Sequence, residues 1–519
     1  MSESGTAVPA PRERAAAERR LIWKLDFLLM PLLTVTLGLQ YYDKAALGSA
    51  VAFGILKDLW LTPKQLSTTH DGVTSTARYS TATACFYYGY IVAVLPMALL
   101  FARLNLRYAA GTVIVIWGVV AILTVVCTNY KGFYVQRFFL GLLESAVSPC
   151  FVAITALWYK PQEQATRLGI WYSATGIFSM FSGAVNYGLG SSGDAHAWKY
   201  IYYFCGSLTI AWGFIVMAIL PASPLQPGPF FTASERDILV RRFEQNPYAR
   251  DRQSFKKDQC IEALLDIRTY IYLFMATMTY MCNGAVTAFG TLIIKSIGYT
   301  GLQSIALGIP GGAVTCITIY FFTYLADKYK NIRTYLFPLS CIPVVVGAIV
   351  IWTAPWHPTA GPLIGYYLVA SFGAPYVLLL AIASANTAGS TKKAITSGAI
   401  FIGYNVGNIA AAYTVKAQEV HIKYRSTWIT VIVSMVVASI ASIVLRFVLI
   451  SMNKKREAAG TADPSPEAVQ AAREDDEKTV TAQTHGSGAV EGEAPLVIDK
   501  VEEYVDLTDK QAPFFRYTL

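Results

Sequence analysis

The chain has 519 residues, of which 54% are hydrophobic and only 14% are charged, and its mean hydropathy is +0.42. This composition excludes an assembly of soluble domains and is typical of a membrane protein. The formal net charge of +9 does not indicate a nucleic-acid partner. Most Lys and Arg residues fall in one alternating set of loops, as they do on the cytoplasmic side of membrane proteins.

Apolar segments long enough to cross a bilayer recur along the whole chain. A bilayer core of about 30 Å requires a helix of roughly 20 apolar residues. The sequence therefore predicts an all-α membrane protein with 12 transmembrane helices, with 11 or 13 as alternatives because the Gly-rich segment 394–413 is the weakest candidate. The predicted segments are 27–50, 79–101, 109–127, 132–157, 169–190, 200–220, 270–292, 304–326, 334–354, 364–386, 394–413 and 427–450.

The longest internal loop divides these segments into two equal sets. We expect a cytoplasmic N-terminal segment (1–26), an N-terminal six-helix half (27–220), a central cytoplasmic loop (221–268), a C-terminal six-helix half (269–450) and a cytoplasmic tail (451–519). The distribution of basic residues places both termini in the cytoplasm. Two halves of this kind suggest a structural repeat with the substrate site between them.

The tail is polar, acidic and low in aromatic residues from about residue 453, and this composition predicts disorder. The last residues, VDLTDKQAPFFRYTL, are less polar. Two interpretations stay open for them, a short recognition element or a solvated end of the tail.

Four charged residues lie deep inside the apolar segments: Asp43, Lys44, Arg137 and Glu144. A charge at the centre of a bilayer costs roughly 2.5–3.5 kcal/mol even on the most lenient scale, so such residues usually serve a function. Arg137 and Glu144 are seven residues apart, which places them on one helix face about 10 Å apart. Asp43 and Lys44 lie on another predicted helix, 27–50, so an acid of one helix can meet a base of the other. The alternative is a structural charge network.

These charges indicate a site that binds an anion and carries a proton. We expect Arg137 and Lys44 to bind the anion. We expect Glu144 to carry the proton, with Asp43 as the alternative carrier, because a base that is occupied by substrate frees its acid to protonate. The usual residue for such a step is histidine, but all five histidines fall in predicted loops or the tail: His70, His196, His357, His421 and His485.

The second half offers amides and phenols in place of charges. Asn405 and Asn408 lie three residues apart on one helix face, beside Tyr404, and Asn283 lies in the segment 270–292. Such groups orient a polar substrate or join helices by hydrogen bonds, and both interpretations stay open.

No motif indicates an enzyme, a cofactor or a metal. The chain has no GxxxxGK[ST] loop and no HExxH motif. Its eight cysteines include no close metal-type pair and are interpreted as small buried apolar residues.

Several longer stretches are similar to a known family. They include KLDFLLMPLL with YYDK, FYYGYIVAVLP, QRFFLGLLESAVSP, NTAGSTKKAITSGAIFIGYNVGNI and the terminal DLTDKQAPFFRY. Over about residues 24–450 the chain resembles the major facilitator superfamily, within it the anion:cation symporter branch, and specifically the fungal allantoate permease family.

The resemblance implies the major facilitator fold and proton-coupled uptake of a small organic anion or vitamin-like carboxylate across the plasma membrane of a fungal cell. It also implies that the acid–base turn of the family maps to Asp43 and Lys44, and its Arg and Glu to Arg137 and Glu144. The family usually has Arg where this chain has Lys44, which leaves the substrate open, since Lys does not make a bidentate contact with a carboxylate.

We expect a secondary active transporter that works by alternating access as a monomer in the lipid bilayer. Two alternatives stay open, an exporter of a secondary metabolite and a non-transporting nutrient sensor that signals through its tail. Fold analogy carries much of this expectation.

Overall fold

The computed structural model is helical in all of the regular elements that it describes. Disorder was predicted from about residue 453, but residues 453–458 continue the last long helix of the chain. Residues 459–507 and parts of the N-terminal segment and central loop lie outside the described residues. These are 11–61, 76–159, 161–192, 194, 196–221, 223–225, 227–244, 256–329, 331–357, 359–458, 508–511 and 515–519.

The first half of the chain forms one group of helices, followed by two short helices. The group consists of α1 (Pro11–Ala52), α2 (Ile55–Asp58), α3 (Ala77–Arg103), α4 (Leu106–Ile122), η2 (Leu123–Val126), α5 (Tyr130–Glu144), α6 (Val147–Trp158), α7 (Pro161–Tyr172), α8 (Ala174–Gly190) and α9 (Ala197–Ile219), and the short helices are α10 (Ala233–Glu244) and α12 (Lys257–Leu265).

The second half forms the other group. Its helices are α13 (Ile267–Tyr280), η3 (Gly284–Ala288), α14 (Gly290–Ser296), α15 (Gly301–Lys328), α16 (Arg333–Thr353), α17 (Ala360–Val369), η4 (Ala370–Phe372), α18 (Gly373–Ala385), α19 (Ser390–Thr414), η5 (Ala417–Ile422) and α20 (Arg425–Ala458).

Within the described residues, eight helices are long and apolar enough to cross a membrane. Four further predicted segments, 79–101, 132–157, 270–292 and 394–413, are helical but are not among these eight. One reason is visible in α5 and α13, which end after 15 and 14 residues. The number of 12 transmembrane helices therefore stays a prediction. The eight candidates are Ala16–Ala52, Leu106–Val126, Arg167–Gly190, Ala197–Ile219, Gly301–Lys328, Arg333–Thr353, Ala360–Ala385 and Arg425–Ala458.

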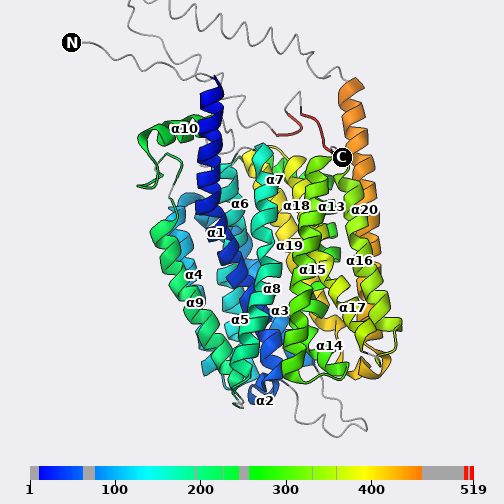
Figure 1. The fold of residues 1–519 in the computed structure, drawn as a ribbon. Coiled ribbons are helices and arrows are strands. Elements are labelled where there is room, and N and C mark those ends of the chain that lie inside the picture. Colours follow the sequence, from blue (N-terminus) through cyan, green and yellow to red (C-terminus); the bar gives the residue numbers. More distant parts are fainter. Residues whose placement is uncertain are drawn as a thin grey trace, which may run out of the picture.

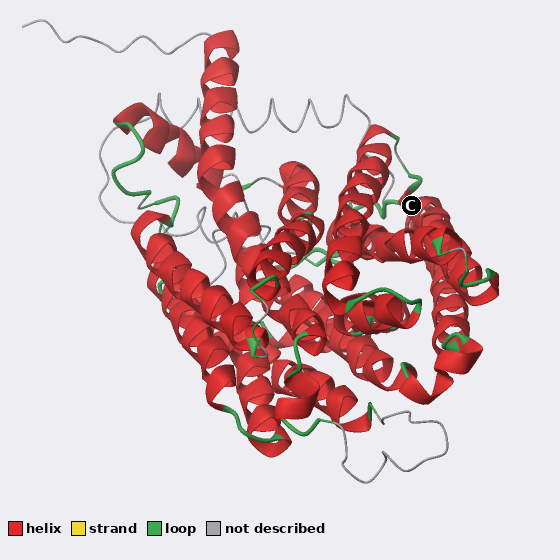
Figure 2. Cartoon of the chain, turned by 60° about the horizontal axis from the view of Figure 1, so that its bottom comes forward, coloured by secondary structure: helices red, strands yellow, loops and turns green. Residues whose placement is uncertain are grey.

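The two groups stand side by side with their long helices roughly parallel (Figures 1 and 2). The beginning of α1 and the last residues of the chain lie at the same end of the molecule, which we call the terminal end, whereas α2 and α14 lie at the opposite end (Figure 1). This arrangement agrees with an even number of membrane crossings.

The groups meet where α8 packs along α15 and α3 packs along α19. The first contact depends on glycine, because a Cβ atom on Gly176 would lie 2.6 Å from the carbonyl oxygen of Gly312. Close backbone approach through small residues is a common way to join helices inside a membrane.

Several helices are interrupted halfway along the molecule. α5 ends at Glu144 before α6 begins, α7 ends at Tyr172 before α8 begins, and α13 ends at Tyr280 before the π-helical turn η3. Interrupted helices and π-helical turns free backbone groups and are frequent at binding sites. The interruptions therefore place an acid and two phenols between the two groups.

A side chain at the glycine contact should separate α8 from α15. We expect Gly176→Val to lower the free energy of unfolding by about 1–3 kcal/mol, the usual effect of overpacking, measured as a lower melting temperature of the detergent-purified protein. The matched control is Gly188→Val on the same helix, where an added Cβ meets no atom within 4 Å. Equal melting temperatures of the two variants would show that this contact does not hold the groups together.

Candidate functional site

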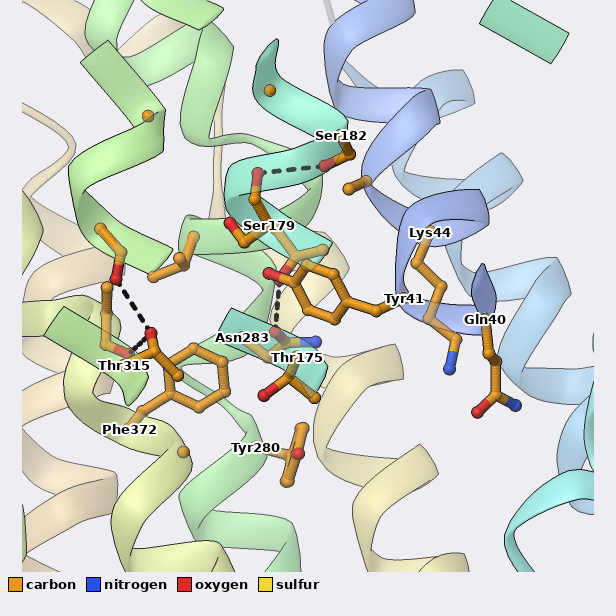
Figure 3. Close-up of a pocket in the computed structure, with 18 of the residues that line it drawn as sticks. Gln40, Tyr41, Lys44, Thr175, Ser179, Ser182, Tyr280, Asn283, Thr315 and Phe372 are labelled. Carbon is orange, nitrogen blue, oxygen red and sulfur yellow. Dashed lines mark hydrogen bonds between the residues drawn. The ribbon is translucent and has the colours of Figure 1, made fainter. Parts of the chain in front are cut away.

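A cavity lies between the two groups of helices (Figure 3). It extends toward the α2–α14 end, because Ser49, Ile294 and Ser304 are part of its lining. The polar lining comes from both groups. It includes Gln40, Tyr41, Lys44, Tyr90, Tyr172, Thr175, Ser179, Ser182, Tyr280, Asn283, Thr287, Thr315, Tyr366, Tyr376 and Tyr404.

Lys44 is the only charged side chain among the described residues of this lining. Gln40 and Lys44 are one helical turn apart on α1 and lie side by side (Figure 3). The Lys44 side chain is 12% exposed, and its ammonium donates a hydrogen bond to the Tyr404 hydroxyl at 3.5 Å. It also lies 5.3 Å from the centre of the Phe86 ring and 5.8 Å from that of Tyr90. The cavity lining therefore has one cationic side chain with aromatic rings around it.

Glu144 is the nearest acid to this lysine. Its carboxylate is completely buried, 3.7 Å from the Lys44 ammonium, and neither of its oxygens accepts a hydrogen bond within the described structure. The backbone brings it there, because Gly141, one turn earlier on α5, lies so close to the Phe86 carbonyl that a Cβ atom would not fit. Lys44 thus lies between the cavity and a carboxylate with few partners.

Asp43 and Arg137 lie away from the cavity, in a network that joins α1, α4, α5 and α9. Asp43 accepts hydrogen bonds from the Trp117 indole and, at 2.8 Å, from the Cys205 thiol. Arg137 donates to the Tyr202 hydroxyl at 2.5 Å and lies 4.8 Å from the centre of the Phe133 ring. The structure therefore brings Lys44 and Glu144 together and directs Asp43 and Arg137 to helix contacts.

Of the four polar residues predicted in the second helix group, two line the cavity and two do not. Asn283 and Tyr404 line the cavity, whereas Asn405 and Asn408 are buried beside it. The Asn283 amide donates to the Asn408 side-chain oxygen at 2.6 Å and accepts from the Thr287 hydroxyl at 2.6 Å. Asn405 donates to the Phe401 carbonyl of its own helix at 2.6 Å. Asn408 thus orients Asn283 without reaching the cavity.

A wall of tyrosines surrounds the predicted Tyr404, and its other members, Tyr172, Tyr280 and Tyr376, were not predicted as site residues. The rings of Tyr280 and Tyr404 lie 4.1 Å apart between centres, those of Tyr280 and Tyr376 lie 4.6 Å apart, and the Tyr172 hydroxyl is hydrogen-bonded to that of Tyr280. Tyr172 belongs to the first group and the other three to the second, so this wall joins the groups across the cavity.

Tyr41 was missed as well. It points from α1 toward Ser179 and Asn283 (Figure 3). A sequence signal existed, because Tyr41 is three residues from Lys44 and therefore shares its helix face. Tyr280 carried no comparable signal.

Comparisons with known proteins agree with this architecture. The family model for the Major Facilitator Superfamily matches residues 27–412. An uncharacterized transporter of Schizosaccharomyces pombe is 31% identical over 508 residues, which cover 97% of this chain and 88% of that protein. The allantoate permease of Saccharomyces cerevisiae is 28% identical over 516 residues, which cover 97% and 87%.

A solved structure shares the fold at low sequence identity. The proton:xylose symporter bound to 6-bromo-6-deoxy-D-glucose has a TM-score of 0.61 with 14% identity, over 80% of this chain and 94% of that one. These relatives are transporters and not enzymes. The chain therefore belongs to the major facilitator superfamily of multi-pass membrane transporters, and the resemblance to the fungal allantoate permease family is confirmed.

Proposed function

We propose that this protein is a proton-coupled importer of a small organic anion. One observation carries the proposal: the only charged side chain in the described lining of the cavity, Lys44, lies 3.7 Å from the fully buried carboxylate of Glu144. A base that faces the cavity with an acid behind it is an arrangement in which an anionic substrate and a proton can exchange charge.

The coupling follows from the cost of an unpaired buried charge. In the empty site the Glu144 carboxylate neutralises the Lys44 ammonium. When the carboxylate of a substrate binds this ammonium, Glu144 shares its nearest counter-charge with a second anion. A buried carboxylate without hydrogen-bond donors is then more stable when protonated. Binding of one anion therefore favours uptake of one proton, and release of both restores the ion pair.

The neutral groups of the cavity orient the rest of the substrate. Asn283, held by Asn408 and Thr287, offers an amide, and the tyrosines offer flat apolar faces with hydroxyl groups. Pockets of this kind bind small molecules through apolar contact and a few fixed polar groups. Asp43 and Arg137 then fix the positions of α1 and α5, which carry Lys44 and Glu144.

We infer that the molecule operates by alternating access, as a monomer in the plasma membrane of a fungal cell. In this proposal 12 transmembrane helices form two halves, 27–220 and 269–450, joined by the cytoplasmic loop 221–268. The terminal end faces the cytoplasm, in line with the basic loops. Rocking of the two groups exposes the cavity to each side in turn.

Uptake of labelled candidates tests the function directly. In a permease-deficient yeast that expresses the protein, we expect uptake of at least one of nicotinate, allantoate, ureidosuccinate, pantothenate and biotin. The rate should be higher at acid than at neutral external pH and should collapse with a protonophore, because the inward proton gradient drives it. Uptake that is indifferent to both would exclude proton coupling.

The proton carrier is identified by two substitutions. Glu144→Gln should abolish accumulation against a gradient but spare substrate exchange, because an amide takes up no proton. Asp43→Asn should retain proton-driven accumulation when the protein reaches the cell surface. The measurement is the ratio of internal to external labelled substrate at acid pH. Accumulation by Glu144→Gln together with its loss in Asp43→Asn would transfer the role to Asp43.

The anion site is tested at Lys44. Lys44→Met should raise KM by roughly 30-fold or more, the equivalent of about 2 kcal/mol for a lost charged hydrogen bond, whereas Lys44→Arg should retain uptake. Lys131→Met removes an exposed lysine of α5 and serves as the matched control. If Lys44→Met has the KM of the unmodified protein, the substrate anion binds elsewhere.

A further inference from the structure

The last described residues of the chain are packed against the terminal end of the second helix group (Figure 1). We call residues 508–511 and 515–519 the docked segment. Thr508 and Asp509 are completely buried, and Tyr517 is 3% exposed. Composition left two interpretations open for these residues, a recognition element or a solvated end, because it does not reveal specific long-range partners, and their burial favours the first.

Asp509 forms the centre of the docking contacts. Its carboxylate lies 2.5 Å from an Arg268 guanidinium nitrogen at the beginning of α13 and 2.7 Å from the Lys392 ammonium at the beginning of α19. It also accepts a hydrogen bond from the Ala388 amide at 3.4 Å. Burial opposes its ionisation, but Arg268 and Lys392 outweigh this effect and hold the pKa of Asp509 below its ordinary value. It is therefore a charged anchor at neutral pH.

At the other end of the docked segment, Tyr517 is bound through its side chain and its backbone, and Thr518 through its backbone. The Tyr517 hydroxyl donates to Asp509 at 2.8 Å, and its ring lies 4.7 Å from the Arg268 guanidinium and 5.2 Å from that of Arg456. The Asn453 amide pairs with both the N–H and the C=O of Tyr517, at 3.0 and 2.9 Å. The Asn386 amide pairs in the same way with Thr518, at 2.8 and 3.0 Å. Two successive residues of an extended peptide are thus held by two amides.

The surface beneath the segment is balanced in charge without it. Arg268 and Lys392 are already paired with Asp266 and Glu262, at 3.1 Å for Lys392–Asp266 and 2.8 Å for Lys392–Glu262. The docked segment adds Asp509 and also Lys510, whose ammonium lies 3.8 Å from Asp266. Arg516 of the segment also pairs with the exposed Glu457, at 3.2 Å. Because Arg268 and Lys392 keep Asp266 and Glu262 as partners, departure of the segment leaves neither of these buried cations unpaired, unlike the loss of one partner of a buried pair.

From this geometry we propose that the docked segment is a reversible latch, a peptide bound in cis at a site built by α13, the α18–α19 turn and α20. When bound, it joins the terminal ends of the helices that carry Tyr280, Asn283 and Tyr404 into the cavity. These helices then move as one body. When the latch is released, the α18–α19 turn moves independently of α13. The proposal does not depend on the substrate or on proton coupling.

A labelled peptide tests the latch in the full-length protein. The probe is a fluorescent synthetic peptide with the sequence of residues 507–519, added to detergent-purified protein. It should bind the Asp509→Asn protein at least about tenfold more tightly than the unmodified protein, whose site is occupied. A peptide with the same Asp509→Asn change should bind neither. Equal binding to both proteins, or to neither, would overturn the proposal.

Amide hydrogen exchange supplies a second, local measurement. In Asp509→Asn, exchange should become faster at residues 386–392 and 262–268, and an excess of the unmodified peptide should reverse the change. Exchange in α4 and α9, which belong to the other helix group, should be unaffected. The matched control is Lys510→Ala, which removes a half-exposed lysine and its long, 3.8 Å ion pair with Asp266. This variant should behave as the unmodified protein. Faster exchange throughout the molecule, or no peptide reversal, would exclude a latch.

Discussion

The pair of Lys44 and Glu144 is the constraint around which the rest of the cavity is arranged. A charge in a membrane interior is stable only near an opposite charge or a strong dipole. Here the ammonium has one carboxylate at 3.7 Å, one phenol at 3.5 Å and the faces of aromatic rings, and the carboxylate is out of reach of solvent. The helix interruption after Glu144 and the close approach of α5 to α3 at Gly141 bring the Glu144 carboxylate close to the Lys44 ammonium.

Two buried charge clusters in this molecule differ in how well they are satisfied. Around Asp266, Arg268 and Asp509 each charge has several short contacts, and a fully satisfied network is rigid. The Lys44–Glu144 pair is sparsely bonded, with both carboxylate oxygens lacking hydrogen bonds in the described structure. The first arrangement suits a firm joint between helices for as long as the docked segment is bound. The second suits a pair whose charge state changes when an anion enters the cavity.

The two helix groups touch through backbone packing at glycines and through tyrosine rings. Backbone approach at Gly176 and Gly312 joins α8 to α15 without long side chains, so the groups are in contact and yet not interlocked. Packing of this kind needs no hydrophobic effect, which is absent between helices in lipid. The tyrosines at the helix interruptions cross the cavity by ring contact and a single hydroxyl pair. Both contacts permit the groups to change their mutual tilt.

Local properties of the sequence were enough to predict where helices form and to single out four charges, of which Asp43, Arg137 and Glu144 are buried and Lys44 lines the cavity, because hydropathy acts over one segment at a time. They did not reveal which way each charge faces. Asp43 and Lys44 are adjacent, yet Asp43 turns to Trp117 and Lys44 to the cavity, since the packing of α4 and α9 sets the orientation of α1. The partners of Asp509 are equally hidden, because Arg268 is 241 residues away along the chain. Contacts of that range exist only once the helices have packed.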